Sequence, residues 1–329
     1  MEKLYSIDFQ LYKVTGVEKV MLDIHHAVKG EYDAKIVGNI PYDEVRPEHN
    51  IRKEEYVQKN SWFMFRNSIV IVHERRLLWV FWVLNHLFFQ RIKIVYIHHN
   101  VFHNHKLITI FPKTIVAISD SSIDNLIQFF GAPKSHIYKI YNCVADEYEG
   151  IHAPMHHDLI TILLPGRINK QKQQLEIVRQ LSGRIDSRIK ILFAGDGPML
   201  EELRTICKGN KSFEVLGFRN DVKELLQKSD FILLFSVHEG LPISLIEATM
   251  VGMPILCNGV GGNTEICING KNGWILNDWD DLIATINNLT NISNEEYSCM
   301  CKESRGIYES RFTFEEFKNK YLYLLAGLK

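Results

Sequence analysis

Short apolar runs alternate with amphipathic stretches along the whole chain. In the first half the runs are Lys3–Ile7, Ala34–Gly38, Ser68–Val72, Lys93–His98 and Thr114–Ile118. In the second half the rhythm restarts with Leu159–Leu164, Ile189–Ala194, Phe213–Leu216, Phe231–Phe235 and Pro254–Cys257. Strands that alternate with helices form a parallel sheet covered by helices. The pattern therefore predicts an α/β chain with two Rossmann-like βαβ domains that face a cleft.

The intervening stretches predict the helices and the domain limits. The helices are Gly16–Val28, Ser121–Gly131, Gln173–Leu181, Pro198–Cys207, Val222–Gln227, Ser244–Val251 and Asp280–Leu289. We expect an N-terminal domain at residues 1–150 and a C-terminal domain at 151–311, joined by the polar stretch Ala145–Asp158. Thr313 and Glu316 predict a capping box at the start of a last helix. Ligands of such sheets bind outside the carboxyl ends of the strands, which is where we expect the site.

Composition narrows the class of protein. A chain of 329 residues fits two domains. With 46% apolar residues, 23% charged residues and a net charge of −1, it lacks the strongly basic balance typical of nucleic-acid binding. The six cysteines have no metal-ligand spacing, so we expect buried free thiols in a reducing compartment. Charged residues throughout the first twenty positions argue against a cleavable signal peptide, and we expect a cytoplasmic protein.

Residues 238–247, HEGLPISLIE, follow one of the predicted strands. Pro242 suits the first turn of a helix, because its missing N–H would be unpaired there. A strand end, a glycine-containing turn and a helix N-terminus together form an anion site. Glu239 and Glu247 bracket this site. A glycosidase role is disfavoured. The two catalytic carboxyl groups of a glycosidase stand about 5 to 9.5 Å apart, whereas two residues eight positions apart in a helix are separated by roughly 12 Å.

The glutamate pair resembles the Glu-x7-Glu signature of retaining GT-B glycosyltransferases, especially glycosyltransferase family 4 (group 1). Residues 261–265, GGNTE, are similar to that family's next segment. The resemblance implies that Glu239 contacts the donor sugar and that Glu247 binds the nucleotide ribose. It also implies that the backbone of Gly240 and Leu241 holds sugar and phosphate, and that the last helix, about residues 312–329, crosses back onto the N-terminal domain.

Residues 165–172, PGRINKQK, lie between a predicted strand and a predicted helix. An arginine fork and a lysine point charge on one loop suit a diphosphate. Arg167 and Lys172 match the two basic positions of the family's Gly-Arg-Leu-x-x-x-Lys element, whereas Lys170 is an extra cation and Gln173 replaces a usual glycine. The resemblance implies that Arg167 and Lys172 stabilise the leaving nucleoside diphosphate without a metal.

Other stretches of the chain resemble further elements of the family. Residues 14–19 resemble its glycine loop, which implies that Gly16 approaches the donor phosphate. His99, with His98 second to it, matches a histidine that contacts the donor sugar, and Phe218 lies in the segment that lines the base pocket. The turn at residues 194–198, AGDGP, is interpreted as architectural. Asp278 is interpreted as a helix cap, so no metal is implied.

Residues 77–89 form one strongly apolar segment with eleven apolar residues out of thirteen. This is short of the ~20 residues that a membrane-spanning helix needs. Two interpretations stay open: a buried helix packed on a sheet, or an interfacial helix flanked by cations that meet anionic lipid. The second would place the protein in peripheral contact with the inner face of the membrane and would suit a lipid-linked acceptor.

The resemblance implies a retaining, metal-independent hexosyltransferase that uses a UDP- or GDP-sugar as substrate and needs no cofactor. The acceptor would be a saccharide or a lipid-linked sugar in polysaccharide or glycoconjugate biosynthesis. A nucleotide-sugar 2-epimerase of related fold is one alternative, and it would need acid and base carboxylates around the sugar C2. A non-catalytic nucleotide-sugar-binding protein is another; it would keep Arg167 and Glu247 but lose the sugar contacts, and Glu239 argues against it.

Overall fold

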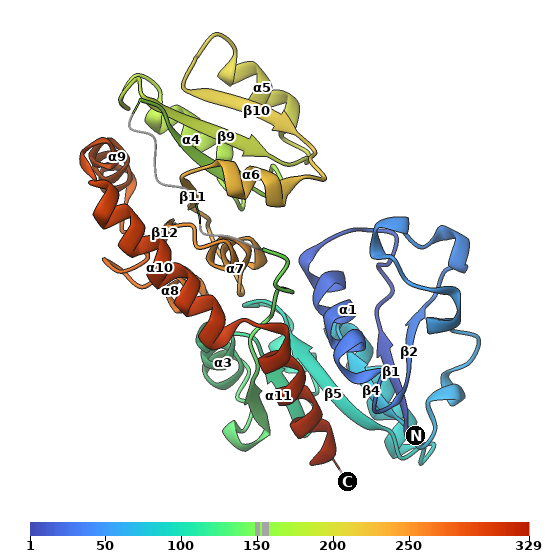
Figure 1. Ribbon diagram of the computed structural model, residues 1–329. Helices are drawn as coiled ribbons and strands as arrows, with labels where there is room; N and C mark the ends of the chain where they lie inside the picture. Colours follow the sequence, from blue (N-terminus) through green and yellow to red (C-terminus); the bar gives the residue numbers. More distant parts are fainter. Residues whose placement is uncertain (149–151, 153–157, 329) are drawn as a thin grey trace. The chain divides into compact units, whose positions relative to one another are not determined.

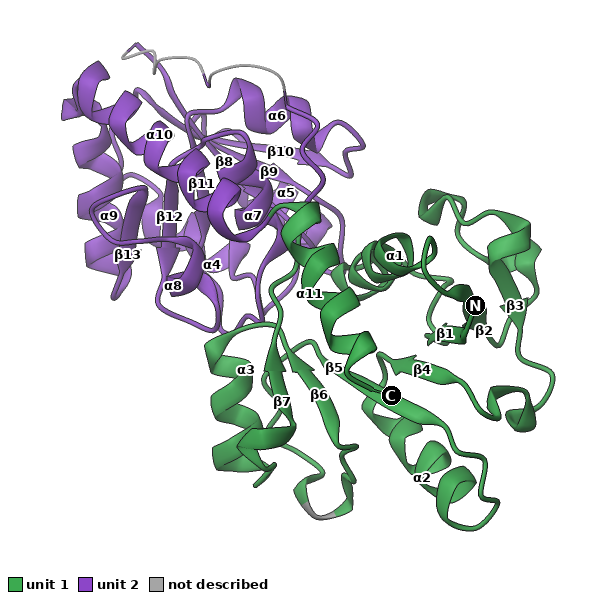
Figure 2. Cartoon of the chain, turned by 60° about the horizontal axis from the view of Figure 1, so that its bottom comes forward, with its two compact units in different colours: residues 1–143, 313–329 green, residues 144–312 purple. Residues whose placement is uncertain are grey.

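The computed structural model describes residues 1–148, 152 and 158–328 (Figure 1). The boundary predicted between residues 150 and 151 lies outside this part of the chain, as does most of the predicted joining stretch. The chain divides into two compact units: residues Met1–Cys143 with Thr313–Lys329 form unit 1, and Val144–Phe312 form unit 2 (Figure 2). Each unit holds one parallel sheet with helices. The predicted fold class, α/β with two Rossmann-like domains, is confirmed.

Unit 1 is built on a seven-stranded sheet in the order β3-β2-β1-β4-β5-β6-β7. The strands are β1 Lys3–Ile7, β2 Asp33–Gly38, β3 Tyr56–Gln58, β4 Ile69–Val72, β5 Lys93–His98, β6 Thr114–Ala117 and β7 Ile137–Lys139. The hydrophobic pattern predicted the five inner strands. It missed β3 and β7, which are three-residue strands at the two edges, because so short a run carries too little periodicity.

The helices of unit 1 include the N-terminal helix α1 and the C-terminal helix α11, which contact each other. The helices are α1 Gly16–Val28, α2 Leu78–His86, α3 Asp120–Asp124, followed by a π-helical turn Asn125–Phe129, and α11 Phe314–Ala326. Short 3-10 turns cover Tyr42–Glu44, Pro47–His49, Lys53–Glu55, Trp62–Phe65, Arg75–Leu77, Lys106–Ile108 and Lys134–His136. None of the described helices has the length and apolar character needed to cross a membrane.

Only half of the capping box predicted at the start of α11 is present. The Glu316 backbone N–H donates to the Thr313 hydroxyl at 3.3 Å. The Glu316 carboxylate does not return to the cap, however; it pairs with Lys320 at 3.0 Å, one turn along the helix. An i, i+4 ion pair therefore competes successfully for this side chain.

Unit 2 is built on a six-stranded sheet in the order β10-β9-β8-β11-β12-β13. The strands are β8 Ile160–Pro165, β9 Ile189–Ala194, β10 Phe213–Gly217, β11 Phe231–Leu234, β12 Ile255–Asn258 and β13 Gly273–Leu276. The helices are α4 Gln174–Leu181, α5 Leu200–Cys207, α6 Val222–Lys228, α7 Ile243–Met250, α8 Asn263–Ile266, α9 Trp279–Asn288 and α10 Asn294–Arg311, with a 3-10 turn Leu289–Asn291. Asp278 caps α9 as predicted, since its carboxylate accepts from the Asp281 N–H at 2.9 Å.

Candidate functional site

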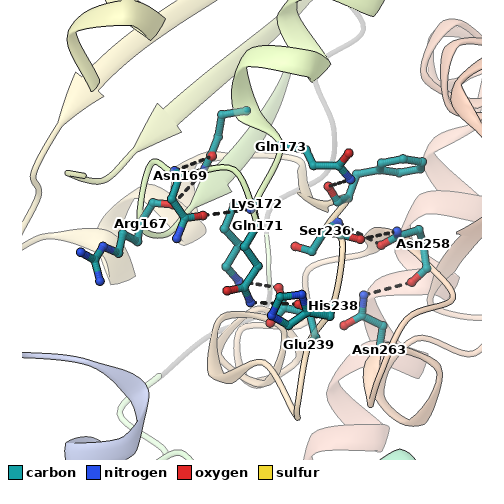
Figure 3. Close-up of polar contacts among 12 residues, drawn as sticks. Arg167, Asn169, Gln171, Lys172, Gln173, Ser236, His238, Glu239, Asn258 and Asn263 are labelled. Carbon is teal, nitrogen blue, oxygen red and sulfur yellow. Dashed lines mark hydrogen bonds and ion pairs between the residues drawn. The ribbon is translucent and has the colours of Figure 1, made fainter. Parts of the chain in front are cut away.

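Two loops meet at the carboxyl edge of the sheet in unit 2. One follows β8 and the other follows β11, and these two strands are hydrogen-bonded neighbours. The Val237 N–H donates to the Gln171 carbonyl at 2.8 Å, and the Gln171 side-chain amide donates to the His238 carbonyl at 2.9 Å (Figure 3). Because the strands are parallel, both loops leave the same edge of the sheet. The predicted basic loop thus docks directly on the predicted glutamate loop.

The centre of the site is an ion pair between Lys172 and Glu239. Their Nζ and Oε1 atoms are 2.7 Å apart, and the side chains are only 16% and 8% exposed. The Asn169 carboxamide oxygen accepts from the Lys172 backbone N–H at 3.0 Å, which fixes the loop at this residue. A largely buried charge is costly without a partner. A ligand that separates the pair must therefore supply an anion to Lys172 and hydrogen-bond donors to Glu239.

Arg167 lies on the same loop but outside this pair. Its side chain is exposed, and its guanidinium points away from Lys172 and Glu239 (Figure 3). Gln174 fixes the backbone of the loop, because its side-chain amide donates to the Arg167 carbonyl at 3.0 Å. The guanidinium is thus held on a fixed backbone while its charge faces solvent.

The glycine turn after β9 supports the loop that carries Arg167. A Cβ atom on Gly195 would lie 1.9 Å from the Gly166 carbonyl oxygen, and one on Gly197 would lie 2.3 Å from the Ile168 carbonyl oxygen. The Ile168 N–H donates across this contact to the Asp196 carbonyl at 2.9 Å. The glycines permit close backbone approach. The architectural interpretation of this turn is confirmed.

The glutamate loop leads into α7. Pro242 is the N-cap, one residue earlier than the helical position predicted for it, and its carbonyl accepts from the Leu245 N–H at 3.1 Å. Leu241 is buried and Gly240 is half-buried, and the Gly240 carbonyl accepts from the Gly262 N–H at 2.7 Å. Glu247 lies further along α7 and is also half-buried. Glu239 therefore precedes this helix, and Glu247 lies in its second turn.

Sequence reasoning missed the residues that hold these loops together. Besides Gln171, Asn258 at the end of β12 bonds to both sides of Ser236: its carboxamide accepts from the Ser236 N–H at 3.1 Å and donates to the Ser236 carbonyl at 2.7 Å. Asn263 donates in turn to the Asn258 carbonyl at 3.0 Å (Figure 3). The GGNTE resemblance pointed to Asn263. For Gln171 and Asn258 the sequence held no signal, because such side-chain to backbone bonds have no fixed spacing.

Two other predicted donor-binding residues are less enclosed. Gly16 is the first residue of α1, where Thr15 caps the helix and the Glu18 carboxylate accepts from the Thr15 N–H at 2.8 Å. A carboxylate thus already occupies this helix N-terminus, as the Thr-x-x-Glu spacing of a capping box indicates. Phe218 follows β10 in unit 2, and its ring is 64% exposed.

Histidines gather at the carboxyl edge of the sheet in unit 1. His98 is fully buried and lies 3.1 Å from the Asn125 carboxamide oxygen, and burial lowers its pKa to about 4. His99 Nε2 lies 2.9 Å from Nδ1 of His73, and the two rings stack at 22°. Burial lowers the pKa of His99 to about 3 and that of His73 well below its usual value. His98 is a core residue, whereas His99 and His73, the latter missed from sequence, form a neutral pair.

The structure thus gathers Arg167, Lys172, Glu239, Gly240 and Leu241 on two adjoining loops of unit 2, with Glu247 on the following helix. Gly16 and His99 belong to unit 1. Across the described residues, no group of three or more His, Cys, Asp or Glu side chains is arranged to hold a metal ion.

Comparison with known proteins places this arrangement in context. Residues 153–305 match the family model described as glycosyl transferases group 1. The Vi polysaccharide biosynthesis protein VipC/TviE of Salmonella typhi is 30% identical over 146 residues, which cover 42% of this chain and 25% of that protein. The UDP-Gal:alpha-D-GlcNAc-diphosphoundecaprenol alpha-1,3-galactosyltransferase of Escherichia coli is 27% identical over 175 residues, which cover 49% of this chain and 45% of that protein. The chain thus spans less than half of the length of each relative.

The fold has solved counterparts as well. HepE of Anabaena, in complex with UDP, superposes with a TM-score of 0.81 at 17% identity, covering 99% of this chain and 100% of that protein. The chain therefore has the two-domain GT-B fold of such proteins, and the sequence match of its second unit supports membership in the group 1 glycosyltransferases.

Proposed function

We propose that the protein is a retaining, metal-independent glycosyltransferase that moves a hexose from a nucleotide-sugar to an acceptor hydroxyl. The observation that carries this proposal is the 2.7 Å contact between Lys172 and Glu239 on two docked loops, with exposed Arg167 on the same basic loop. A cation pair and a carboxylate on one edge suit a ligand with a diphosphate at one end and sugar hydroxyls at the other.

The ion pair provides a route to donor binding. When a diphosphate arrives, Lys172 and Arg167 bind its oxygens, and the Glu239 carboxylate is released to accept hydrogen bonds from sugar hydroxyls. Glu247 binds the ribose, while the backbone of Gly240 and Leu241 contacts sugar and phosphate. The backbone around Phe218 lines the base pocket, Gly16 approaches the phosphate, and His99 contacts the sugar as a neutral imidazole.

The transfer itself needs no covalent intermediate on the protein. The bond between sugar C1 and the diphosphate oxygen breaks, and the acceptor oxygen bonds to C1 on the face from which the diphosphate departs. The acceptor proton passes to the departing phosphate oxygen. The products are a nucleoside diphosphate and a glycoside that keeps the donor's anomeric configuration. Arg167 and Lys172 offset the charge that grows on the leaving group, which is electrostatic catalysis.

The relatives support a choice of substrates. We propose a UDP-sugar as donor, because the structural counterpart binds UDP and the E. coli relative is named for UDP-Gal. The same relative is named for a diphosphoundecaprenol-linked sugar, and the S. typhi relative for polysaccharide biosynthesis. A lipid-linked acceptor used at the inner face of the membrane, in polysaccharide assembly, fits both.

A donor screen followed by a transfer assay tests the proposal. UDP-sugars at 100 times their dissociation constant should stabilise the protein by about 2.7 kcal/mol in thermal unfolding, and GDP-sugars should stabilise it less. The stabilising donor should then release UDP only when an acceptor is present. Conversion of that donor into its 2-epimer without acceptor would replace this proposal with the epimerase. Binding without any turnover on a panel of lipid-linked acceptors would favour a nucleotide-sugar-binding protein.

A further inference from the structure

Helix α2 carries apolar side chains all round its first seven residues, Leu78–Leu84, although only one side of it is buried. Leu78, Phe81 and Leu84 pack into the core of unit 1. On the opposite side Trp79 is 44% exposed and Val83 is half-buried. A helix that is hydrophobic all round is normally enclosed. The outer side of α2 therefore exposes apolar side chains to solvent.

Aromatic residues extend this surface beyond the helix. Phe63 and Phe88 pack edge to face with ring centres 5.5 Å apart, yet they are 54% and 52% exposed. Phe89 follows with 76% exposure. An apolar groove of about 380 Å³ runs between Phe63, Trp79 and Phe88. We call Phe63, Trp79, Val83, Phe88 and Phe89 the α2 face. Contiguous exposed apolar surface of this kind marks an interaction site.

The inner flank of α2 borders a second cavity, of about 470 Å³. Trp82 and Phe111 contribute to its walls, and Lys93 and Lys113 also line it. An apolar cavity with ammonium groups in its lining suits the junction of an acyl chain and an anionic headgroup better than it suits a polar protein surface.

The charge around the α2 face is strongly one-sided. Residues 59–113 contain eight lysines and arginines and a single acid, Glu74, whereas the whole chain has a net charge of −1. Glu74 pairs with Arg76, and Lys93 pairs with Glu2 from outside the segment. Arg66, Arg91 and Lys113 are exposed. This segment therefore presents positive charge next to exposed aromatic rings.

Charge also discriminates between the occupants that could cover this surface. In a two-fold symmetric dimer the same patch meets itself, so the cations around one α2 face would oppose those around the other. An anionic bilayer reverses the sign: basic side chains gain about 1 kcal/mol each near such a surface, and tryptophan and phenylalanine rings enter the headgroup boundary.

We propose that the α2 face docks unit 1 on an anionic lipid surface, with Phe88, Phe89 and Trp79 in the headgroup boundary and Arg66, Arg91 and Lys113 against anionic headgroups. This deepens the proposed function and rests on its lipid-linked acceptor, because docking would hold unit 1 where such an acceptor lies. The contact is interfacial, since the nine residues of α2 are far short of a spanning helix.

Vesicle sedimentation of the full chain, without donor or acceptor, tests the proposal. We expect the protein to sediment with vesicles of phosphatidylcholine and phosphatidylglycerol, to stay in solution with phosphatidylcholine alone, and to be released by salt. Arg66→Glu with Lys113→Glu should lower the partition coefficient by roughly 600-fold, because each of four charge units is worth about fivefold. Phe88→Ser with Phe89→Ser should lower it at least tenfold, since two exposed rings lose their burial.

Matched variants control for general effects on surface and fold. Lys53→Glu and Tyr323→Ser change an exposed lysine and an 85% exposed aromatic of the same unit outside the α2 face, and they should partition like the parent protein. Thermal unfolding shows whether a variant is folded, and the charge variants change only exposed side chains. Equal binding to both vesicle types, no binding, or control variants that lose binding as strongly would overturn the proposal.

Two readouts separate this inference from the proposed function. If the α2-face variants instead change a concentration-dependent dimer in analytical ultracentrifugation and leave vesicle binding unaltered, the occupant is a second copy and the proposal is wrong. UDP titration of the same variants should be unchanged, because the α2 face contains none of the residues proposed to contact the nucleotide. Loss of vesicle binding with intact UDP binding supports docking, whereas absent UDP binding in the parent protein counts only against the proposed function.

Discussion

The two units share a parallel-sheet plan but differ at the carboxyl edges of their sheets. In unit 2 that edge holds charges: Lys172 and Glu239 pair with each other, and Arg167 faces solvent. In unit 1 it holds His73 and His99, whose pKa values burial lowers so that both are neutral near pH 7, beside an ion pair between Glu74 and Arg76. Under the proposed function, the pair in unit 2 is exchanged for the donor diphosphate, and the histidines of unit 1 offer uncharged hydrogen-bonding groups to hydroxyls.

The difference depends on whether a buried ionisable group has an opposite charge beside it. Burial penalises the charged form of a group unless an opposite charge lies close by. Lys172 has Glu239 as such a partner, whereas the group that lies 2.9 Å from His73 is another imidazole, that of His99. The comparison teaches that the cationic contacts to a diphosphate should come from unit 2, whereas unit 1 should contribute only the uncharged contacts proposed for Gly16 and His99. The predictions below test this division.

The largest expected effect follows loss of a cation in unit 2. Arg167→Ala and Lys172→Ala should each lower kcat on the order of 10²-fold, because these charges matter most when negative charge grows on the leaving phosphate. Initial-rate kinetics measure the effect. Lys170→Ala, which removes an exposed cation from the same loop, is the matched control and should stay within a few-fold of the parent enzyme. Full activity in both variants would make the loop merely structural.

Removal of Glu247 should have the next largest effect. Glu247→Ala should weaken UDP binding by roughly 1.5–3 kcal/mol, the range for hydrogen bonds to a charged acceptor. Titration calorimetry with UDP measures the loss. Glu201→Ala removes a glutamate that is exposed on another helix of unit 2, and it should leave the affinity unchanged. An unaltered affinity in Glu247→Ala would exclude the ribose contact.

The buried histidines of unit 1 should make stability depend on pH. The folded-state pKa of His98 is lowered to about 4, so this group binds its proton less readily when folded, and stability is lost as pH falls below about 6.5. Burial raises the pKa of Asp8 to about 7, which acts in the opposite sense: its contribution is present at low pH and lost as pH rises toward that value.

Chemical unfolding of the parent and His98→Gln at pH 6.5 and pH 5 isolates the histidine contribution from that of Asp8. The variant should lose less stability on acidification, by up to about 2 kcal/mol, because a proton that only the unfolded state binds is worth about 1.4 kcal/mol per pH unit. Equal losses in both proteins would mean that His98 is not held neutral.

The smallest effect concerns Gln173, which stands where the resemblance led us to expect glycine. Its φ is +55°, a left-handed conformation, and its side-chain amide donates to the Phe235 carbonyl at 3.2 Å. Gln173→Gly relieves the backbone cost and loses the bond, whereas Gln173→Ala keeps the cost and loses the bond. The glycine variant should therefore be more stable than the alanine variant by about 1 kcal/mol in chemical unfolding. Equal stabilities would mean that the turn is unstrained.

Sequence patterns predicted the inner strands and most helices, because buried parallel strands and amphipathic helices leave strong periodic signals. Helix α1 and strand β5 have the predicted limits. The 18-residue helix α10 was missed because its apolar positions are sparse, although Ser293 and Glu296 form a capping box that signals its start. The weak strand β13 was missed as well, since four residues that include Gly273 carry little pattern.

The candidate site was predictable as residues but not as contacts. Motif resemblance identified Lys172 and Glu239, which are 67 positions apart in the chain. Their direct pairing depends on the adjacency of β8 and β11 in the sheet, which requires the strand order. His73 was missed for a similar reason: it becomes a partner of His99 only because β4 lies beside β5.

The most direct test of the account is the configuration of the product formed in the presence of EDTA. With an accepted α-linked UDP-sugar, proton NMR should show an α-linked product. The rate should equal that measured without chelator, because Arg167 and Lys172 offset the negative charge of the diphosphate in place of a metal. A β-linked product would contradict retention. Activity abolished by EDTA and restored by magnesium or manganese would contradict the assignment of the diphosphate to these two cations.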